Sequence, residues 1–162
     1  MKQIPLTQGK VALVDDADYD RLMAMGKWHY TAQGYAARSY GYKRESDGRR
    51  SNKTILMHRM VFNTSEGMDT DHIDNDKLNN QRNNLRVCTR SENKQNCGKR
   101  CNNTSGYKGV SWSKSKKRWQ VFIWIKYKQI NLGIFTDKIE AAKVYNEAAL
   151  KYHGEFARLN EI

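Results

Sequence analysis

Short apolar runs in the first part of the chain predict β-strands. Two such runs, residues 4–6 and 11–14, flank Gln8 and Gly9, a pattern typical of a hairpin. The charged segment 43–53, which contains Gly and Ser, is predicted to be an exposed loop. Further strands are predicted at 28–30, 35–40 and 54–57.

A short helix is predicted after the hairpin, near residues 17–25. Asp15 and Asp16 are suitable N-cap residues, and Gly26 is a suitable exit residue. Residues 4–62 are therefore predicted to be an α+β lead-in. We expect this lead-in to act as a scaffold for the segment 63–96, and an independent contact with a ligand is the alternative.

The segment 63–96 is rich in Asp, Asn and Arg and predicts the order strand, loop, strand, helix. Asp71 and His72 precede a polar loop, and residues 85–88 alternate as a short strand. Thr89 and Glu92 form a capping box, which predicts that a helix begins there. This layout can bring Asp71 and Asn93 to one point, with His72 beside them.

The last part of the chain predicts three strands and one helix. Residues 118–126 alternate in polarity, so that one face carries Trp119, Val121, Ile123 and Ile125. A helix is predicted at about 137–152, with small alanines facing inward and Gly154 as its exit residue. The predicted division is therefore 1–96, a linker at 97–105, and 106–162.

The charge distribution indicates a polyanionic partner. The 162 residues include 29 Lys and Arg against 17 Asp and Glu, a formal net charge of +12. No acidic residue occurs between Glu92 and Asp137, where cations alternate with aromatic residues. Such a composition suits phosphates and bases. Simple solubility is the alternative explanation.

Other features exclude several classes of protein. No apolar run reaches the roughly 20 residues of a membrane helix, and the first residues lack the apolar region of a secretion signal. The three cysteines, Cys88, Cys97 and Cys101, contain no Cys-x-x-Cys pair, so neither a disulfide framework nor structural zinc is expected. We expect a cytoplasmic location, with no membrane and no small-molecule substrate.

The residue types around His72 suit phosphodiester hydrolysis. A histidine with an ordinary pKa of about 6.5 can take a proton from water at neutral pH. Asp and Asn offer the oxygen ligands that a hard cation prefers, and two protein ligands leave room for phosphate and water. Asp74 and Asp76 are expected to be turn formers, with metal binding as the alternative. His58 is expected to be structural, and Arg59 structural or phosphate-facing.

Asp71-His72, Asn84-Leu85-Arg86, Thr89 and Glu92-Asn93 resemble the ββα-metal motif of HNH nucleases. The resemblance is to the variant whose last metal-binding residue is Asn, as in phage homing endonucleases. It implies His72 as the general base and Asp71 and Asn93 as ligands of one divalent cation, Mg²⁺ or else Mn²⁺. It also implies that Asn84 fixes the loop and orients His72.

Residues 106–160 resemble the DNA-binding domain of plant ethylene-response factors, the APETALA type. The resemblance rests on Gly106-Tyr-Lys-Gly-Val110, Trp119, Leu132-Gly-Ile-Phe135, Ala141-Ala142, Tyr145-Asn146 and Leu159-Asn160. It implies a three-stranded antiparallel sheet packed on one helix, with the open face in the major groove of double-stranded DNA. The residues expected to contact DNA are Lys108, Ser111, Lys116, Arg118, Gln120, Phe122, Trp124, Lys126 and Asn131.

This sheet departs from the plant pattern, which uses several arginines for base readout. Lys108, Ser111, Phe122 and Trp124 stand at the corresponding places, so a different or looser sequence preference is expected. The alternative for Phe122 and Trp124 is that the N-terminal half covers them.

The combined prediction is a metal-dependent DNA endonuclease whose own DNA-binding module selects the site. A non-catalytic DNA-binding regulator is the alternative, and an RNA-binding protein is a third interpretation of the basic, aromatic sheet. The sequence does not specify the target sequence, the choice between a nick and a double cut, or the oligomeric state.

Overall fold

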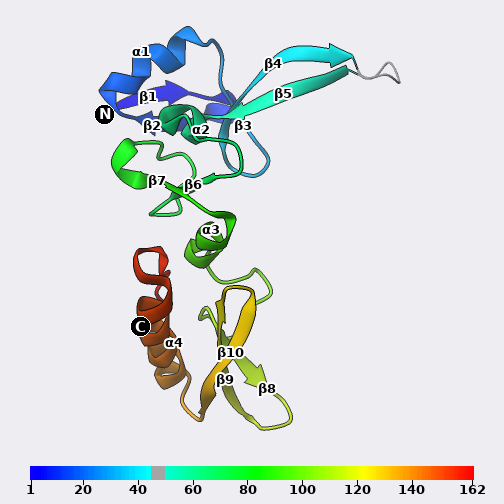
Figure 1. The fold of residues 1–162 in the computed structure, drawn as a ribbon, viewed down its shortest axis with the longest axis vertical. Helices are drawn as coiled ribbons and strands as arrows, with labels where there is room; N and C mark the ends of the chain where they lie inside the picture. Colours follow the sequence, from blue (N-terminus) through cyan, green and yellow to red (C-terminus); the bar gives the residue numbers. More distant parts are fainter. Residues whose placement is uncertain (45–49) are drawn as a thin grey trace. The chain divides into compact units, whose positions relative to one another are not determined.

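The computed structural model describes residues 1–44 and 50–162, which form two units, residues 1–89 and 90–162 (Figure 1). Each unit combines helices with small antiparallel sheets, so the predicted α+β class is confirmed. Each unit also has its own hydrophobic core.

The first unit contains three small sheets, with strand orders β1-β2, β3-β4-β5 and β6-β7. Its strands and helices are, in order, β1 (Lys2–Pro5), η1 (Thr7–Gly9), β2 (Val11–Val14), α1 (Asp16–Ala24), β3 (His29–Tyr30), β4 (Ala36–Arg44), β5 (Arg50–Leu56), α2 (Met57–Phe62), β6 (Asp69–His72), η2 (Arg82–Asn84) and β7 (Leu85–Cys88).

The predicted hairpin and first helix are confirmed. β1 and β2 pair antiparallel, and Gln8 and Gly9 between them adopt positive φ angles of 62° and 66°. Asp15 is the N-cap residue of α1, but its side chain makes no capping bond. Its carboxylate instead accepts hydrogen bonds from the Gln81 side chain and from the backbone amide of Arg82. The side chain therefore makes a tertiary contact rather than capping the helix.

The prediction of a loop at 43–53 is wrong for its first and last residues, which belong to β4 and β5. β4 and β5 continue as a paired ribbon, with Lys43 opposite Ser51 and Arg44 opposite Arg50, while residues 45–49 lie outside the described residues. Backbone pairing between antiparallel strands satisfies the peptide groups of a polar sequence as well as those of an apolar one. Polarity alone therefore predicted the wrong boundaries.

Helix α2 was not predicted, and its first residue, Met57, had been assigned to a strand. A short apolar run does not distinguish a strand from a helix. In the structure Met57 and Val61 are both buried, and their spacing of four residues places them on the same face of α2. They join a core formed by the hairpin, α1, α2, and the first residues of β4 and β7.

The second unit contains α3 (Arg90–Asn96), β8 (Val110–Ser113), β9 (Arg118–Ile125), β10 (Lys128–Phe135), α4 (Lys138–His153) and η3 (Gly154–Phe156). The three strands form an antiparallel sheet in the order β10-β9-β8, and α4 packs along it (Figure 1). The predicted strands and helix are confirmed. Asp137 caps α4 by accepting a bond from the Glu140 amide, and Gly154 ends the helix with a φ of 54°.

Small residues let α4 approach the sheet closely. Ala141, Ala142 and Ala149 are fully buried against Val121 and Ile123 of β9. The predicted inward face of β9 is thus the face that packs on α4.

The segment 97–105, predicted as a linker, belongs to the second unit. Ser105 is buried there, and its hydroxyl donates to the carbonyl oxygens of Tyr107 and Val110. Asn103 donates to the same carbonyls. These bonds pack the end of the segment against the start of β8.

Candidate active site

Strands β6 and β7 position the two adjacent residues of the predicted site. Their antiparallel register places Asp71 opposite Arg86 and His72 opposite Leu85. Neighbouring residues of a strand point to opposite faces, so the carboxylate and the imidazole lie on different sides of this small sheet. Both residues are only 5% exposed.

The carboxylate of Asp71 forms an ion pair with Arg86. Its Oδ2 accepts from Nε at 3.0 Å and from Nη2 at 2.8 Å. The guanidinium balances the charge of a carboxylate that would otherwise be costly to bury.

The imidazole of His72 is held on two sides. Its Nε2 lies 3.3 Å from Oδ1 of Asn80, and its ring packs edge-on against that of His58 with centroids 4.9 Å apart. Tyr35 completes the cluster, with its ring centroid 5.3 Å from that of His58 and 6.1 Å from that of His72.

Burial lowers the pKa of His72, although its bond with Asn80 and the nearby carboxylates of Asp74, Asp71 and Asp76 oppose the shift. The ring is therefore neutral at neutral pH. A neutral imidazole is the form that can accept a proton.

Asn84 closes the loop that comes after His72. Its amide donates to the Asp74 carboxylate and to the Asn79 carbonyl, both at 2.8 Å, and its Oδ1 accepts from the Asp74 amide at 3.0 Å. Asp74 and Asp76 each accept a backbone amide two residues ahead, as expected of turn formers. The side chain of His72, however, bonds to Asn80.

The lead-in braces this loop from the other side. Buried Asp18 of α1 accepts from Nε and Nη2 of Arg82 at 2.7 and 2.9 Å, and also from Arg21. These bonds lower the pKa of Asp18, with Arg82 as the largest cause. The lead-in thus supports η2, which contains Asn84, through the bonds from Arg82 to Asp18. This agrees with the scaffold role expected of the lead-in.

His58 is a buried neighbour of His72 for which the sequence indicated only a structural role. It lies on α2, is 5% exposed, and its Nδ1 is buried with no hydrogen-bond partner among the described residues. Burial lowers its pKa to about 3, with His72 and Arg59 as smaller causes. Arg59 itself donates to the carbonyls of Met68 and Ser65, so it holds the turn before β6.

Asn93 lies on α3, in the second unit, where its carbonyl accepts a bond from the Cys97 thiol. A shared cation site of Asp71 and Asn93 therefore stays a prediction. Within residues 1–44 and 50–162, no three His, Cys, Asp or Glu side chains are placed to hold one metal ion.

The sheet of the second unit gathers most of the residues predicted to contact DNA. Strand alternation and register place these residues on the face away from α4: Ser111, Arg118, Gln120, Phe122, Trp124 and Asn131. Trp124 is 54% exposed and Phe122 is half-buried. Lys116 and Lys126 are exposed in the turns at the two ends of β9.

A groove of about 810 Å³ is lined by this sheet and by residues 91–104 of the same unit. Among the described residues, the charged side chains that line this groove are all basic. They are Lys94, Lys99, Arg100, Lys108 and Lys126. Phe122, Trp124 and Tyr127 add aromatic rings to the lining. Flat rings among cations are the composition that binds bases and phosphates.

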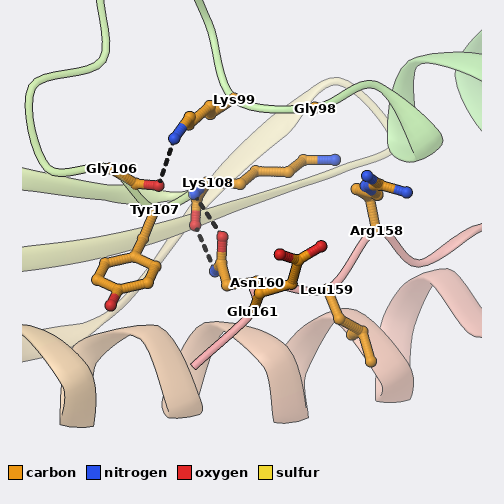
Figure 2. Close-up of a pocket in the computed structure, with 9 residues that line it drawn as sticks. All are labelled: Gly98, Lys99, Gly106, Tyr107, Lys108, Arg158, Leu159, Asn160 and Glu161. Carbon is orange, nitrogen blue, oxygen red and sulfur yellow. Dashed lines mark hydrogen bonds between the residues drawn. The ribbon is translucent and has the colours of Figure 1, made fainter. Parts of the chain in front are cut away.

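Lys108 has a structural partner as well. Its ammonium donates to the Gln95 carbonyl at the C-terminal end of α3, and burial lowers its pKa to about 8. Figure 2 shows that its backbone N–H and C=O are both bonded to the side chain of Asn160, beside a cavity of about 300 Å³. Lys108 therefore ties α3 to the sheet, a role that the sequence did not suggest.

The comparisons with known proteins identify the family. Residues 56–95 match the family described as HNH endonuclease, a region that spans α2 to α3. Over 93 residues the chain is 37% identical to Protein 3.8 of Escherichia phage T7, covering 57% of this chain and 76% of that protein. The chain belongs to the HNH endonuclease family. This HNH-type nuclease thus carries the Asp71-His72 pair within its matched region.

Plant proteins match a shorter part of this HNH nuclease. APETALA2-like protein 2 of Oryza sativa is 39% identical over 57 residues, which is 35% of this chain but only 13% of the plant protein. The AP2-like ethylene-responsive transcription factor TOE2 of Arabidopsis thaliana matches to the same extent, with 12% of its length covered. No solved structure matches the chain. Within the described residues, no helix combines the length and apolar character needed to cross a membrane.

Proposed function

We propose that this HNH nuclease is a divalent-metal-dependent DNA endonuclease that hydrolyses phosphodiester bonds at sites selected by its C-terminal sheet. The observation that carries the proposal is the geometry of His72. Its neutral imidazole is fixed between His58 and Asn80, next in sequence to the buried carboxylate of Asp71. A neutral imidazole that is held in place suits proton transfer from water during phosphodiester cleavage.

In the proposed mechanism His72 takes a proton from the attacking water. Asn84 keeps the loop after β6 closed, so the strand end that carries His72 does not move. The order β-strand, loop, β-strand and helix supports the proposed ββα-metal motif, in which Asn84 would be the bracing residue.

Asp71 and Asn93 are the proposed protein ligands of one divalent cation, Mg²⁺ in preference to Mn²⁺. Their side-chain oxygens are the donors that a hard cation prefers. When bound, such a cation would neutralise charge on the scissile phosphate and the leaving oxygen.

The C-terminal unit is the proposed DNA-binding module, of the APETALA type. The support is its sheet face, where Arg118, Gln120, Phe122 and Trp124 alternate along β9, together with the cationic groove. The partial match to plant APETALA2-like proteins agrees with this assignment. Double-stranded DNA is the proposed partner, and the protein is proposed to be phage-borne and to act inside the host cell.

Cleavage of supercoiled plasmid by the full chain tests the proposal. With Mg²⁺ or Mn²⁺ the wild-type protein should nick or linearise the plasmid, and EDTA should stop the reaction. His72→Ala should lower the rate by about 10²–10⁴ with little change in DNA affinity. His29→Ala, in β3, is the matched histidine control and should cut normally.

The same assay separates the functional alternatives. Equal cleavage by His72→Ala would remove His72 from the mechanism. DNA binding without cleavage in any divalent metal would favour a non-catalytic regulator instead. Asp71→Ala and Asn93→Ala should each raise the metal concentration needed for half-maximal cleavage, and an unchanged metal dependence would refute the ligand assignment.

A further inference from the structure

Asn80 is a buried polar residue next to the proposed base, and the sequence pattern suggested no role for it. It is 1% exposed and lies in the loop between β6 and η2. Its backbone amide donates to the Leu13 carbonyl at 2.8 Å, and its side-chain amide donates to the Leu78 carbonyl at 3.0 Å. A buried side chain with so many fixed bonds has a defined orientation.

The bond to Leu78 decides which end of the amide faces His72. A carbonyl oxygen can only accept, so the group that points to Leu78 must be the Nδ2 amino group of Asn80. Its Oδ1 is then the atom that lies 3.3 Å from Nε2 of His72. Turning the amide over would set the Asn80 oxygen against the oxygen of Leu78.

The orientation of Asn80 in turn fixes the tautomer of His72. An amide oxygen has no proton to give, so Nε2 of His72 must be the donor and must carry the hydrogen. In a neutral imidazole the other nitrogen, Nδ1, then holds the lone pair. We propose that Asn80 is a positioning residue, which holds His72 as the Nε2–H tautomer and makes Nδ1 the nitrogen that receives the proton. The proton-transfer part rests on the proposed function.

The proposed step conserves atoms and protons. Nδ1 of His72 takes one proton from water as the water oxygen forms its bond to phosphorus. The bond from phosphorus to the sugar oxygen breaks, and that oxygen takes a proton from solvent. His72 thereby becomes imidazolium, with Nε2–H still donating to Asn80.

The N-terminal hairpin supports this arrangement. Leu13 of β2 accepts from the Asn80 amide, and its own amide donates to the Leu78 carbonyl, both at 2.8 Å. The two bonds bracket Asn79, which forms a parallel bridge with Leu13. The hairpin thus fixes the backbone of Asn80, which orients His72, and of Leu78, which accepts the bond from the Asn80 side chain, and this gives residues 1–14 a specific task in the site.

Nuclear magnetic resonance of histidine-labelled full-length protein tests the tautomer directly. The ¹⁵N and ¹³C shifts of His72, followed along a pH titration, should report hydrogen on Nε2 in the neutral form of the ring. This measurement needs no variant. Hydrogen on Nδ1 would overturn the proposal whether or not the protein cuts DNA.

Two variants test the part played by Asn80. Asn80→Leu removes the acceptor and keeps the branched shape of the side chain, so the His72 shifts should move toward a tautomer mixture and kcat should fall on the order of 10²-fold, with KM for plasmid unchanged. Asn80→Asp keeps an oxygen opposite Nε2 and should restore the Nε2–H tautomer. Its second oxygen then faces the Leu78 carbonyl in place of the amino group, so kcat should recover only in part.

Three outcomes decide the matter. If Asn80→Leu keeps the Nε2–H tautomer and wild-type kcat, Asn80 is not the positioning residue. If Asn80→Leu does not fold, the proposal is tested by the tautomer of His72 in the wild-type protein and in Asn80→Asp. Loss of the Nε2–H tautomer in Asn80→Asp would overturn the proposal. A correct tautomer with no His72-dependent cleavage would instead overturn the proposed function, and with it the proton transfer to Nδ1.

Discussion

The imidazole of His58 lies edge-on to that of His72, with an interplanar angle of 80° and ring centroids 4.9 Å apart. His58 comes from α2 and His72 from the end of β6, so the contact joins two elements of the matched HNH region. The proposed base is thus positioned by a second buried histidine as well as by Asn80.

The buried state of His58 predicts a pH-dependent contribution to stability. Burial lowers its folded-state pKa to about 3, below the ordinary value of 6.5. Its contribution is therefore fully present above pH 6.5 and is lost as the pH falls from 6.5 toward 3, by about 1.4 kcal/mol per pH unit. His58→Phe keeps the ring and removes this titration. Urea unfolding between pH 4 and 8 should show a flatter dependence for the variant, and parallel curves would contradict the assignment.

The ion pair between Arg86 and Asp71 predicts a large effect of removing the cation. Both side chains are mostly buried, with exposures of 13% and 6%. Arg86→Ala takes the guanidinium from a buried carboxylate and should lower the free energy of unfolding by about 3–5 kcal/mol. Adding Asp71→Asn to that variant should recover part of the loss. Urea midpoints of the three proteins measure both effects, and a double variant no more stable than Arg86→Ala would refute this account.

Gly109 is predicted to be irreplaceable in the second unit. A Cβ there would overlap Cδ2 of the Tyr145 ring, and the φ of +77° already disfavours other residues. Gly109→Ala should destabilise the unit by roughly 2–5 kcal/mol. Gly106→Ala is the matched control, since its φ is +85° but its Cβ would meet open space, and it should cost about 1–2 kcal/mol.

Tryptophan fluorescence can follow the second unit alone. Trp28 is the single tryptophan of the first unit, so both glycine variants are best made in a Trp28→Phe background. Equal unfolding midpoints for Gly109→Ala and Gly106→Ala would show that the contact with Tyr145 does not restrict this position.

Trp124 is predicted to contribute directly to DNA affinity. Its indole is 54% exposed on the sheet face and lines the cationic groove. Trp124→Ala should weaken binding by about 1–3 kcal/mol, as expected for loss of a ring that stacks on a base. Fluorescence anisotropy with labelled duplex measures this. Tyr152→Ala on α4, which removes another exposed ring, should leave the affinity unchanged.

The cations at the two ends of β9 are predicted to contact phosphates. Neutralising Arg118 and Lys126 to Gln should reduce the slope of log K against log salt by about one for each lost phosphate contact. Lys143→Gln, an exposed change on α4, is the control for net charge and should leave the slope unchanged. Equal slopes for all variants would remove these two cations from the interface.

The sequence by itself determined the elements whose signals are local. The alternation along residues 118–125, the cap at Asp137 and the exit at Gly154 specified the sheet and α4 of the second unit. The strand, loop, strand and helix order of residues 69–96 was likewise predictable, because its turn residues and apolar positions are neighbours in the chain. The family of the nuclease was predictable from the same short segment.

Only the tertiary structure decided which partners hold the candidate site. Asn80 bonds to Leu13, Arg82 to Asp18 and His72 packs on His58, all through contacts between distant parts of the chain. Lys108, which was expected to contact DNA, donates a hydrogen bond to Gln95. At both ends of the loop predicted at 43–53, residues instead pair between β4 and β5. The local pattern of residues indicates the secondary structure of each segment. Burial and hydrogen-bond satisfaction between segments, which decide the role of a polar residue, depend on the whole fold.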